Sequence, residues 1–256
     1  MSLDHCRDLV ARGDADRHTV TRAASDESQA RLYPIYALNL EIARAAWASP
    51  EPMVCEMRLQ WWADAVAALG QGAAAPHPVL DACGFLRGDA GAAAVLGALV
   101  EARRRDVWDD PFADAAALWQ HLDATGGGLM WLAARALGAA PQAEPAVRAY
   151  GGAAALAGWL RAVPALAAQG RHPLPDPAPA AVAGLAREGL ARVAQARARR
   201  HDVPRAAAPA LLAGWQAPAV LSLAARDPDR VAAGTLAPSE FARRGTLLWR
   251  AISGRW

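Results

Sequence analysis

The chain has 256 residues, a formal net charge of +2 and a hydrophobic fraction of 54%, with only 6% aromatic residues. This length allows one substantial core, built largely from small side chains. Its 27 basic residues are all arginine and are interspersed with acidic ones, so the composition carries no nucleic-acid-binding signature and we expect no nucleic-acid partner. Three widely spaced cysteines, Cys6, Cys55 and Cys83, predict free thiols in a reducing compartment.

Helical patterns follow one another along the chain, and no strand pattern or internal repeat interrupts them. A short helix is expected at residues 4–13, followed by a polar run at 14–28 and a helical hairpin at 31–66. Further helices are predicted at 79–87, 96–107, 112–122, 127–137, 146–163, 181–200, 207–225 and 239–254. Residues 88–97 should be helical only where packing supports them, and the 172–180 segment is a proline-rich connector. The pattern predicts a single all-α domain over residues 1–256.

The hairpin at residues 31–66 organises this pattern, because Pro50 and Pro52 separate two segments of good helix formers. In the first segment the spacing predicts one inward stripe: Leu32, Ile35, Tyr36, Asn39, Ala43 and Ala46. In the second segment the expected stripe is Met57, Trp61, Ala65 and Leu69. Glu41 and Arg44 are three residues apart and can touch. Arg58 precedes the adjacent Trp61 and Trp62, which is typical of a pocket wall or an interface.

Three stretches of the sequence resemble the squalene/phytoene synthase family of all-α prenyltransferases. They are LYPIYALNLEIARA with EMRLQWWADAV in the hairpin, LWQHLDATGGGLMWLAARALG at residues 118–138, and GGAAALAGWLRAVPALAAQGRHPLP at 151–175. The resemblance implies a single helical domain of the isoprenoid synthase type. It also implies that active members condense two prenyl diphosphates, using Mg²⁺ held by two facing aspartate-rich helices.

The sequence departs from the family at both aspartate motifs. About two turns after Tyr36, where the first acidic cluster is expected, it has Ala43, Arg44 and Trp47, with only Glu41 nearby. At the second position it has Gly158, Leu160, Arg161, Ala162, Ala165 and Leu166, and Pro164 is expected to end the helix. Because Mg²⁺ needs hard oxygen ligands, we expect no metal site, no cofactor and no catalytic residue. Mg²⁺ is expected as a cofactor only under the alternative that the chain is an active prenyltransferase.

Other acidic and histidine residues offer no clear substitute. Asp106, Asp109 and Asp110 could place two carboxylates on one helix face, but a helix end beside Arg103–Arg105 favours ordinary surface pairing. The same interpretation applies to the pairs Asp4 with Asp8 and Asp227 with Asp229. The six histidines occur singly and predict solvated or helix-capping roles.

Membrane signals are weak. The N-terminal segment is too charged for a secretory signal peptide, so we expect a cytoplasmic protein. The apolar run at residues 206–225 contains Pro209 and Pro218 and predicts a buried, broken helix. The predicted helix at 239–254, with Trp249 and Trp256, suggests peripheral contact with the inner face of the membrane or docking onto the bundle.

The closest branch by resemblance contains the respiratory complex I assembly factor and keeps NxExAR, RLQWW and LRxxP while dropping the aspartates. The residues that match it here are Asn39, Glu41, Arg44, Arg58 to Trp62, and Arg161 to Pro164. The resemblance implies a non-catalytic protein that assists assembly of respiratory NADH dehydrogenase, with a respiratory-complex subunit or assembly protein as partner. The resemblance also implies a vestigial pocket for an isoprenoid-like ligand, which comprises Tyr36, Asn39, Glu41, Arg44, Arg58, Trp61, Trp62 and Arg161. The alternatives are an active head-to-head prenyltransferase and an isoprenoid- or lipid-binding protein.

Overall fold

The computed structural model describes residues 2–73, 75–108, 110–237, 245–247, 249–250 and 256, and within these residues it contains helices and no strand. The helices are α1 (Ser2–Gly13), α2 (Ala15–Arg22), α3 (Asp26–Ala45), α4 (Pro52–Gly70), α5 (Pro78–Ala82), α6 (Ala90–Trp108), α7 (Ala115–Leu122), α8 (Gly128–Ala136), α9 (Glu144–Ala168), α10 (Pro179–Ala198), α11 (Ala208–Leu212), α12 (Ala217–Arg226) and α13 (Asp229–Ala232). A π-helical turn, η2 (Asp123–Gly127), joins α7 to α8. The predicted all-α, single-domain fold is confirmed.

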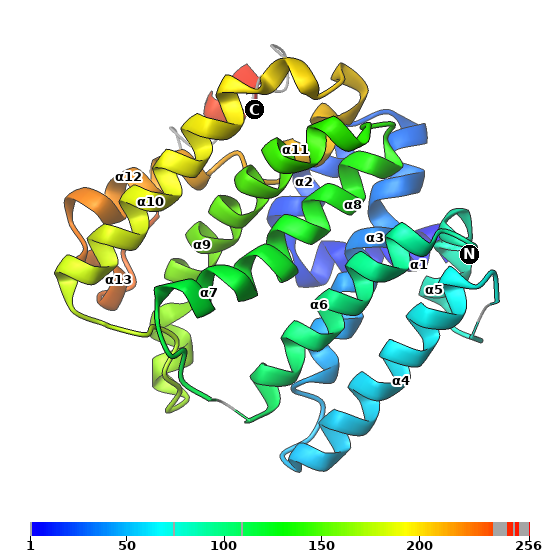
Figure 1. Ribbon diagram of the computed structural model, residues 1–256, viewed down its shortest axis with the longest axis horizontal. Helices are drawn as coiled ribbons and strands as arrows, with labels where there is room; N and C mark the ends of the chain where they lie inside the picture. Colours follow the sequence, from blue (N-terminus) through cyan, green and yellow to red (C-terminus); the bar gives the residue numbers. More distant parts are fainter. Residues whose placement is uncertain (1, 74, 109, 238–244, 248, 251–255) are drawn as a thin grey trace.

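The bundle is arranged around α8 and α9, with α4 and α10 at opposite edges (Figure 1). One large apolar cluster runs through it and includes Leu32 and Tyr36 of α3, Leu132 of α8 and Leu156 of α9. Alanine and glycine supply much of the helix surface, so neighbouring helices approach closely. The stretch Pro141–Ala168, which contains α9, is long and apolar enough to cross a membrane, and 39% of its most apolar part is buried inside the bundle.

The organising hairpin forms as α3 and α4. Ser25 caps the start of α3 by accepting a hydrogen bond from the Ser28 amide, and Pro52 lies in the first turn of α4, where its missing N–H costs nothing. Residues 32–39 are buried all round the helix. The buried stripe of α4 is Cys55, Leu59, Trp62, Ala65, Val66 and Leu69. The predicted stripe is therefore wrong in its first half, since Met57 is 70% and Trp61 is 41% exposed.

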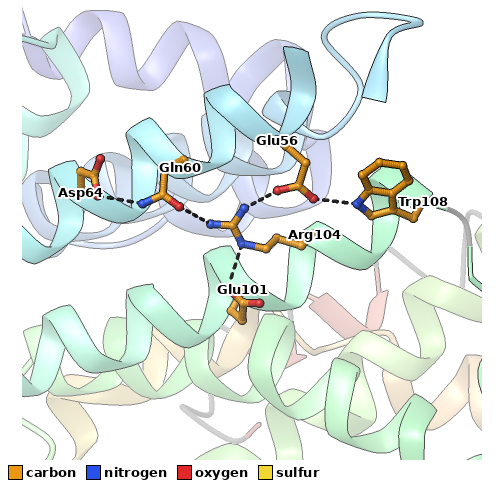
Figure 2. Close-up of polar contacts among 6 residues, drawn as sticks. All are labelled: Glu56, Gln60, Asp64, Glu101, Arg104 and Trp108. Atoms are coloured by element: carbon orange, nitrogen blue, oxygen red, sulfur yellow. Dashed lines mark hydrogen bonds and ion pairs between the residues drawn. The ribbon is translucent and has the colours of Figure 1, made fainter. Parts of the chain in front are cut away.

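A polar network fastens α4 to α6 (Figure 2). Arg104 of α6 donates to Glu101 at 2.9 Å, to Gln60 at 2.8 Å and also to Glu56. The indole Nε1 of Trp108 donates to the other oxygen of Glu56 at 2.9 Å. Glu56 and Gln60 of α4 thus both bind the Arg104 guanidinium. These bonds fix the orientation of α4 about its own axis relative to α6, the helix with which it has its largest contact.

Several boundaries differ from the sequence-based expectations. The polar run at residues 14–28 contains α2, which begins where the Asp14 side chain accepts the Arg17 amide. Pro164 does not end α9, because a proline this near the terminus removes one hydrogen bond and the helix runs on to Ala168. The predicted helix at 79–87 divides into α5 and a 3₁₀ turn, Gly84–Leu86. The apolar run at 206–225 forms α11 and α12, bent by 46°, which confirms a broken helix.

Most of the predicted C-terminal helix lies outside the described residues. Of its interface residues, Trp249 is 64% exposed, whereas Trp256 is buried against Tyr150 with ring centroids 5.0 Å apart. The three cysteines are free and buried, and burial raises the pKa of the Cys6 thiol to about 11. The prediction of free thiols is confirmed.

Candidate functional site

A central cavity of about 270 Å³ lies between α9 and the helices that surround it. Its walls come from α2, α3, α6, the α7–η2–α8 segment, α9 and the α11–α12 turn. The lining residues are Asp14, Asp16, Arg17, Asn39, Arg103, His121, Leu122, Thr125, Gly126, Met130, Gly151, Ala154, Ala155, Ala157, Gly158, Trp159, Arg161, Ala213, Gly214, Gln216, Ala217 and Val220. One side of the cavity is therefore polar, and the α9 wall is made mainly of alanine and glycine.

The glycines on the α9 side allow three segments to meet. A Cβ atom at Gly126 would overlap the Cβ of Ala155, and one at Gly151 would lie 2.8 Å from the Gly126 carbonyl oxygen. A Cβ at Gly214 would lie 2.7 Å from the Tyr150 ring. Tyr150 instead donates its hydroxyl to the Gly214 carbonyl at 3.0 Å. Close backbone approach thus sets the width of the cavity at η2 and at the α11–α12 turn.

The three arginines of the cavity lining are each paired with a carboxylate. Arg17 lies 2.8 Å from Asp14, and Arg103 lies 3.1 Å from the buried Asp106. Arg161 of α9 lies 3.4 Å from Asp16 of α2. Asp16 also accepts a 2.7 Å hydrogen bond from Gln216. The charges around the cavity therefore neutralise one another within the protein.

Two nearly buried side chains in the lining carry polar atoms that have no hydrogen-bond partner among the described residues. Asn39 is 5% exposed and its Oδ1 is unpartnered; His121 is 6% exposed and its Nε2 is unpartnered. Burial lowers the His121 pKa to about 4, against the opposing attraction of Asp106, so the imidazole is neutral at pH 7. Arg103 Nε, from the same lining, is also buried without a partner.

Aromatic rings form the wall beside His121. Its ring centroid lies 5.6 Å from that of Phe112 and 5.3 Å from that of Trp159, both in edge-to-face arrangements. The Trp159 Nε1 donates to the Pro173 carbonyl at 2.8 Å, which ties the proline-rich connector to α9. This wall holds the imidazole in one orientation.

The eight predicted pocket residues do not form one site. Asn39 and Arg161 line the central cavity. Tyr36 is buried under the Arg17 guanidinium, 5.3 Å from its ring centroid, and burial raises its pKa to about 12. The other five, Glu41, Arg44, Arg58, Trp61 and Trp62, line a separate surface groove.

This surface groove, which we term the outer groove, measures about 450 Å³ and lies between α3 and α4, with His77 at its edge. Glu41 and Arg44 pair at 3.4 Å, as predicted. The rings of Trp61 and Trp62 pack edge to face at 4.9 Å, and Trp62 contacts His77 at 5.0 Å. His77 also accepts the Val79 amide at the start of α5, which confirms a capping role for this histidine.

Sequence reasoning missed several cavity residues: Asp14, Asp16, Arg17, Arg103, His121 and Gln216. The capping pattern at Asp14 could have revealed α2, but no local signal connects Asp16 to partners 145 and 200 residues away. Two expectations are wrong: His121 is neither solvated nor capping, and Asp106 is 4% exposed rather than on the surface.

The alternative carboxylate groups do not assemble into a metal-ligating set in the described part of the chain. There, no three His, Cys, Asp or Glu side chains come together as a cation site. Asp106 pairs with Arg103, Asp110 is exposed, and Asp109 lies outside the described residues. Asp4 pairs with Arg7 at 3.6 Å, and Asp227 pairs with Arg230 at 2.7 Å.

Comparisons with known proteins place these features in a family. The family model for squalene/phytoene synthase matches residues 10–237. Among solved structures, a dehydrosqualene synthase in complex with a ligand is similar, with a TM-score of 0.81 and 13% sequence identity. The match covers 98% of this chain and 95% of that one, and at this identity it shows the shared fold. No curated protein matches the sequence. Since the family model spans most of the chain, this protein belongs to the squalene/phytoene synthase family.

Proposed function

We propose that this protein is a non-catalytic member of the family that assists assembly of respiratory NADH dehydrogenase. The observation that carries the non-catalytic part is the pairing of every arginine in the cavity lining with a carboxylate of the same protein. The cavity lining therefore offers no uncompensated arginine to bind a diphosphate and no uncompensated aspartate to bind a metal ion.

The Mg²⁺ that the family resemblance implies does not fit the residues present. Mg²⁺ prefers octahedral oxygen coordination and is usually held by carboxylates together with substrate phosphates. The cavity lining offers Asp14 and Asp16, both from the start of α2, while the α9 wall opposite offers Gly151, Ala154 and Gly158. Asp14 is engaged in capping α2, and Asp16 is held by Arg161 and Gln216. A metal bridging two helices would have ligands on one of them only.

Diphosphate recognition is also disfavoured. Arginines bind phosphate through several donors at once, and an arginine already held by a carboxylate must exchange that partner first. A volume of about 270 Å³ is also just below the roughly 300–1,000 Å³ of pockets that enclose drug-sized ligands, which argues against two prenyl chains side by side.

The assembly part of the proposal rests on where the branch-specific residues lie. Glu41, Arg44, Arg58, Trp61 and Trp62 belong to the pattern that resembles the complex I assembly factor, and all five line the outer groove. Trp61 is 41% exposed and Met57, beside it on α4, is 70% exposed. Exposed aromatic and arginine side chains are enriched at protein interfaces. A groove of this kind suits contact with a partner subunit, and assembly of a membrane enzyme would bring the protein to the inner face of the membrane.

Two measurements test the proposal. Purified protein supplied with Mg²⁺ and farnesyl or geranylgeranyl diphosphate should release no pyrophosphate and form no prenyl product; Mg²⁺-dependent turnover would establish the active prenyltransferase instead. In a deletion strain, native gels of membranes should show less assembled NADH dehydrogenase. Complementation should fail with Arg58→Ala/Trp61→Ala and succeed with a matched surface variant, Arg187→Ala on α10. Normal assembly in the deletion strain would remove the assembly role and leave a lipid-binding protein.

Membrane contact through residues 239–256 is a separate proposal, because most of that segment lies outside the described residues. Co-sedimentation with membranes should fall when the segment is deleted, and an unchanged bound fraction would contradict it. Since Trp256 packs on Tyr150, the single variant Trp249→Ser is the cleaner test: it changes an exposed residue.

A further inference from the structure

Three arginines gather near the end of α10 around two shared oxygen atoms. Arg197 and Arg200 donate to the carbonyl oxygen of Trp256 at 3.2 and 3.3 Å. Arg250 donates to the hydroxyl oxygen of Tyr150 at 3.3 Å, and Arg197 bonds to the same hydroxyl. Because Arg197 shares one acceptor with each of the other two, all three guanidiniums lie close together. We term Arg197, Arg200 and Arg250 the arginine cluster.

The positive charge of the arginine cluster is not neutralised by the described part of the protein. There, no carboxylate pairs with any of its three members, and the acidic residue nearest in sequence, Asp202, binds Arg199 at 2.9 Å. The arginines of the central cavity differ, since each lies within 3.4 Å of an aspartate. Trp256 can contribute at most one negative charge against three positive ones. The cluster therefore keeps an excess of positive charge.

Like charges held together in this way favour an anion. Burial lowers the pKa of Arg197, and the neighbouring charges of Arg250 and Arg200 lower it further. The Nε of Arg200 is buried and has no hydrogen-bond partner among the described residues. Each guanidinium carries five N–H donors, and the bonds to Trp256 and Tyr150 use only some of them. A bound anion would relieve the repulsion and accept from the remaining donors.

The arrangement of these donors suits a phosphate group. Arginine recognises phosphate through its planar fork of donors, and the several oxygens of one phosphate can accept from more than one guanidinium. All three members of the cluster are partly exposed, so an anion can reach them from solvent. Neither the cluster nor Tyr150 lines the central cavity, so this place differs from the diphosphate site that the family resemblance implies.

We propose that the arginine cluster binds a phosphate group outside the central cavity, presented either by a lipid headgroup or by a soluble phosphate ester. A lipid is the expected source, because Trp249, the neighbour of Arg250 in sequence, is 64% exposed and tryptophan favours the membrane interface. The inference does not depend on the non-catalytic or assembly role. It adds a charged component to the proposed membrane contact of residues 239–256.

Vesicle binding tests the lipid source. The purified full chain is co-sedimented with vesicles of phosphatidylcholine alone and of an equimolar mixture with phosphatidylglycerol. Arg200→Gln/Arg250→Gln should weaken binding to the anionic vesicles about thirtyfold, since each basic contact contributes a factor of about five. The matched control, Arg187→Gln/Arg226→Gln, removes two exposed charges outside the cluster and should weaken binding less than about threefold. Equal weakening in both variants would overturn the inference, because general charge would then explain it.

Glycerol phosphate tests the soluble source. It should raise the thermal unfolding temperature of the wild type and of the control variant, but not that of Arg200→Gln/Arg250→Gln. This result, with equal vesicle binding by wild type and cluster variant, would assign the phosphate to a soluble ester. If the cluster variant lost neither vesicle binding nor this stabilisation, the arginines would serve only to hold Trp256 and Tyr150, and the inference would be wrong.

A third variant separates this site from the proposed membrane contact itself. Trp249→Ser should lower binding to both kinds of vesicle, because it removes an exposed apolar ring, whereas the cluster variant should lower binding to the anionic vesicles alone. Loss of binding in Trp249→Ser together with wild-type responses to vesicles and glycerol phosphate in the cluster variant would reject the phosphate site and leave the membrane contact standing.

Discussion

His121 shows how one buried side chain links the cavity to stability. Burial holds its pKa at about 4 in the folded protein, below the value of 6.5 expected when the chain is unfolded. Between these two values the unfolded chain binds a proton that the folded protein does not. Folding stability should therefore fall as the pH drops from 6.5 toward 4, by about 3 kcal/mol from this residue. Urea unfolding at pH 7.0 and 4.5 measures the loss.

The variant His121→Leu isolates this contribution, since leucine cannot take up a proton. Its stability should change less than that of the wild type over the same pH interval. The control is Gln120→Leu on the same helix, which introduces the same side chain at an exposed position and removes no titratable group, so it should keep the wild-type pH dependence. An identical decline in His121→Leu and wild type would show that other groups cause the acid sensitivity.

Sequence and structure diverge most at this scale. Asn39 and Arg161 could be assigned to the cavity because the family resemblance covers their motifs. His121 and Asp106 could not, because one helical segment does not reveal which of its faces another segment will bury. Trp61 is the opposite case, a large aromatic residue predicted to face inward that is 41% exposed at the outer groove. Burial of a given side chain is decided by tertiary packing rather than by its type alone.

At the scale of helices, the fold depends on close contact between η2 and α9. Gly126 and Gly151 face each other, and Gly126 has no room for a methyl group beside Ala155. Gly126→Ala should therefore overpack the contact and destabilise the protein by about 1–3 kcal/mol. Thermal or urea unfolding of the purified variant measures this loss.

A glycine-to-alanine substitution at a helix position with no close neighbours provides the control. Gly184→Ala lies inside α10 with nothing within 4 Å of the new methyl, so it should stabilise the protein by up to about 1 kcal/mol through helix propensity. If Gly126→Ala behaved like Gly184→Ala, the close approach at η2 would have no energetic importance.

The polar network between α4 and α6 gives a second prediction at the scale of helices. Arg104→Met keeps the apolar stem but removes the bonds to Glu56, Gln60 and Glu101, and should cost about 2 kcal/mol of folding free energy. Glu101 is 73% exposed, so Glu101→Gln should cost less than about 0.5 kcal/mol. Chemical denaturation measures the free energy of unfolding of both variants. Equal losses would mean that the bonds of Arg104 to Glu56 and Gln60 contribute nothing to stability.

Most helices could be predicted from sequence, because alanine-rich segments with proline and glycine breaks signal them directly. The hairpin of α3 and α4 is the clearest case. The exceptions have physical causes: α2 is polar and depends on the Asp14 cap, and α9 continues past Pro164 because one lost hydrogen bond near its end is tolerable. The positions of most helices thus follow from the local sequence, whereas the ends of the helices depend in part on contacts with neighbouring segments.

At the scale of the whole molecule, the cavity is assembled from segments that lie far apart in the sequence. Their contacts could not be predicted from the sequence alone. Asp16 is the clearest example: it joins α2 to Arg161 of α9 and to Gln216 at the start of α12. These contacts cross the polar side of the cavity. Asp16 therefore ties α2 to the C-terminal half of the bundle, beside the apolar contact of Val20 with Leu212 and Trp215.

Asp16→Ala should therefore loosen α2 without unfolding the rest of the protein. The side chains of Asp16 and Arg161 are 31% and 40% exposed, so the global cost should be only about 0.5–1 kcal/mol. Locally, amide hydrogen exchange in Ala15–Arg22 should accelerate several-fold, while α8 and α9 remain protected, because α2 opens as a unit when its fastening is lost. Asp16→Asn, which can still accept from Gln216, should give an intermediate rate. Uniform acceleration across all helices would indicate global destabilisation, and exchange at the wild-type rate in α2 would show that contacts other than Asp16 hold this wall of the cavity.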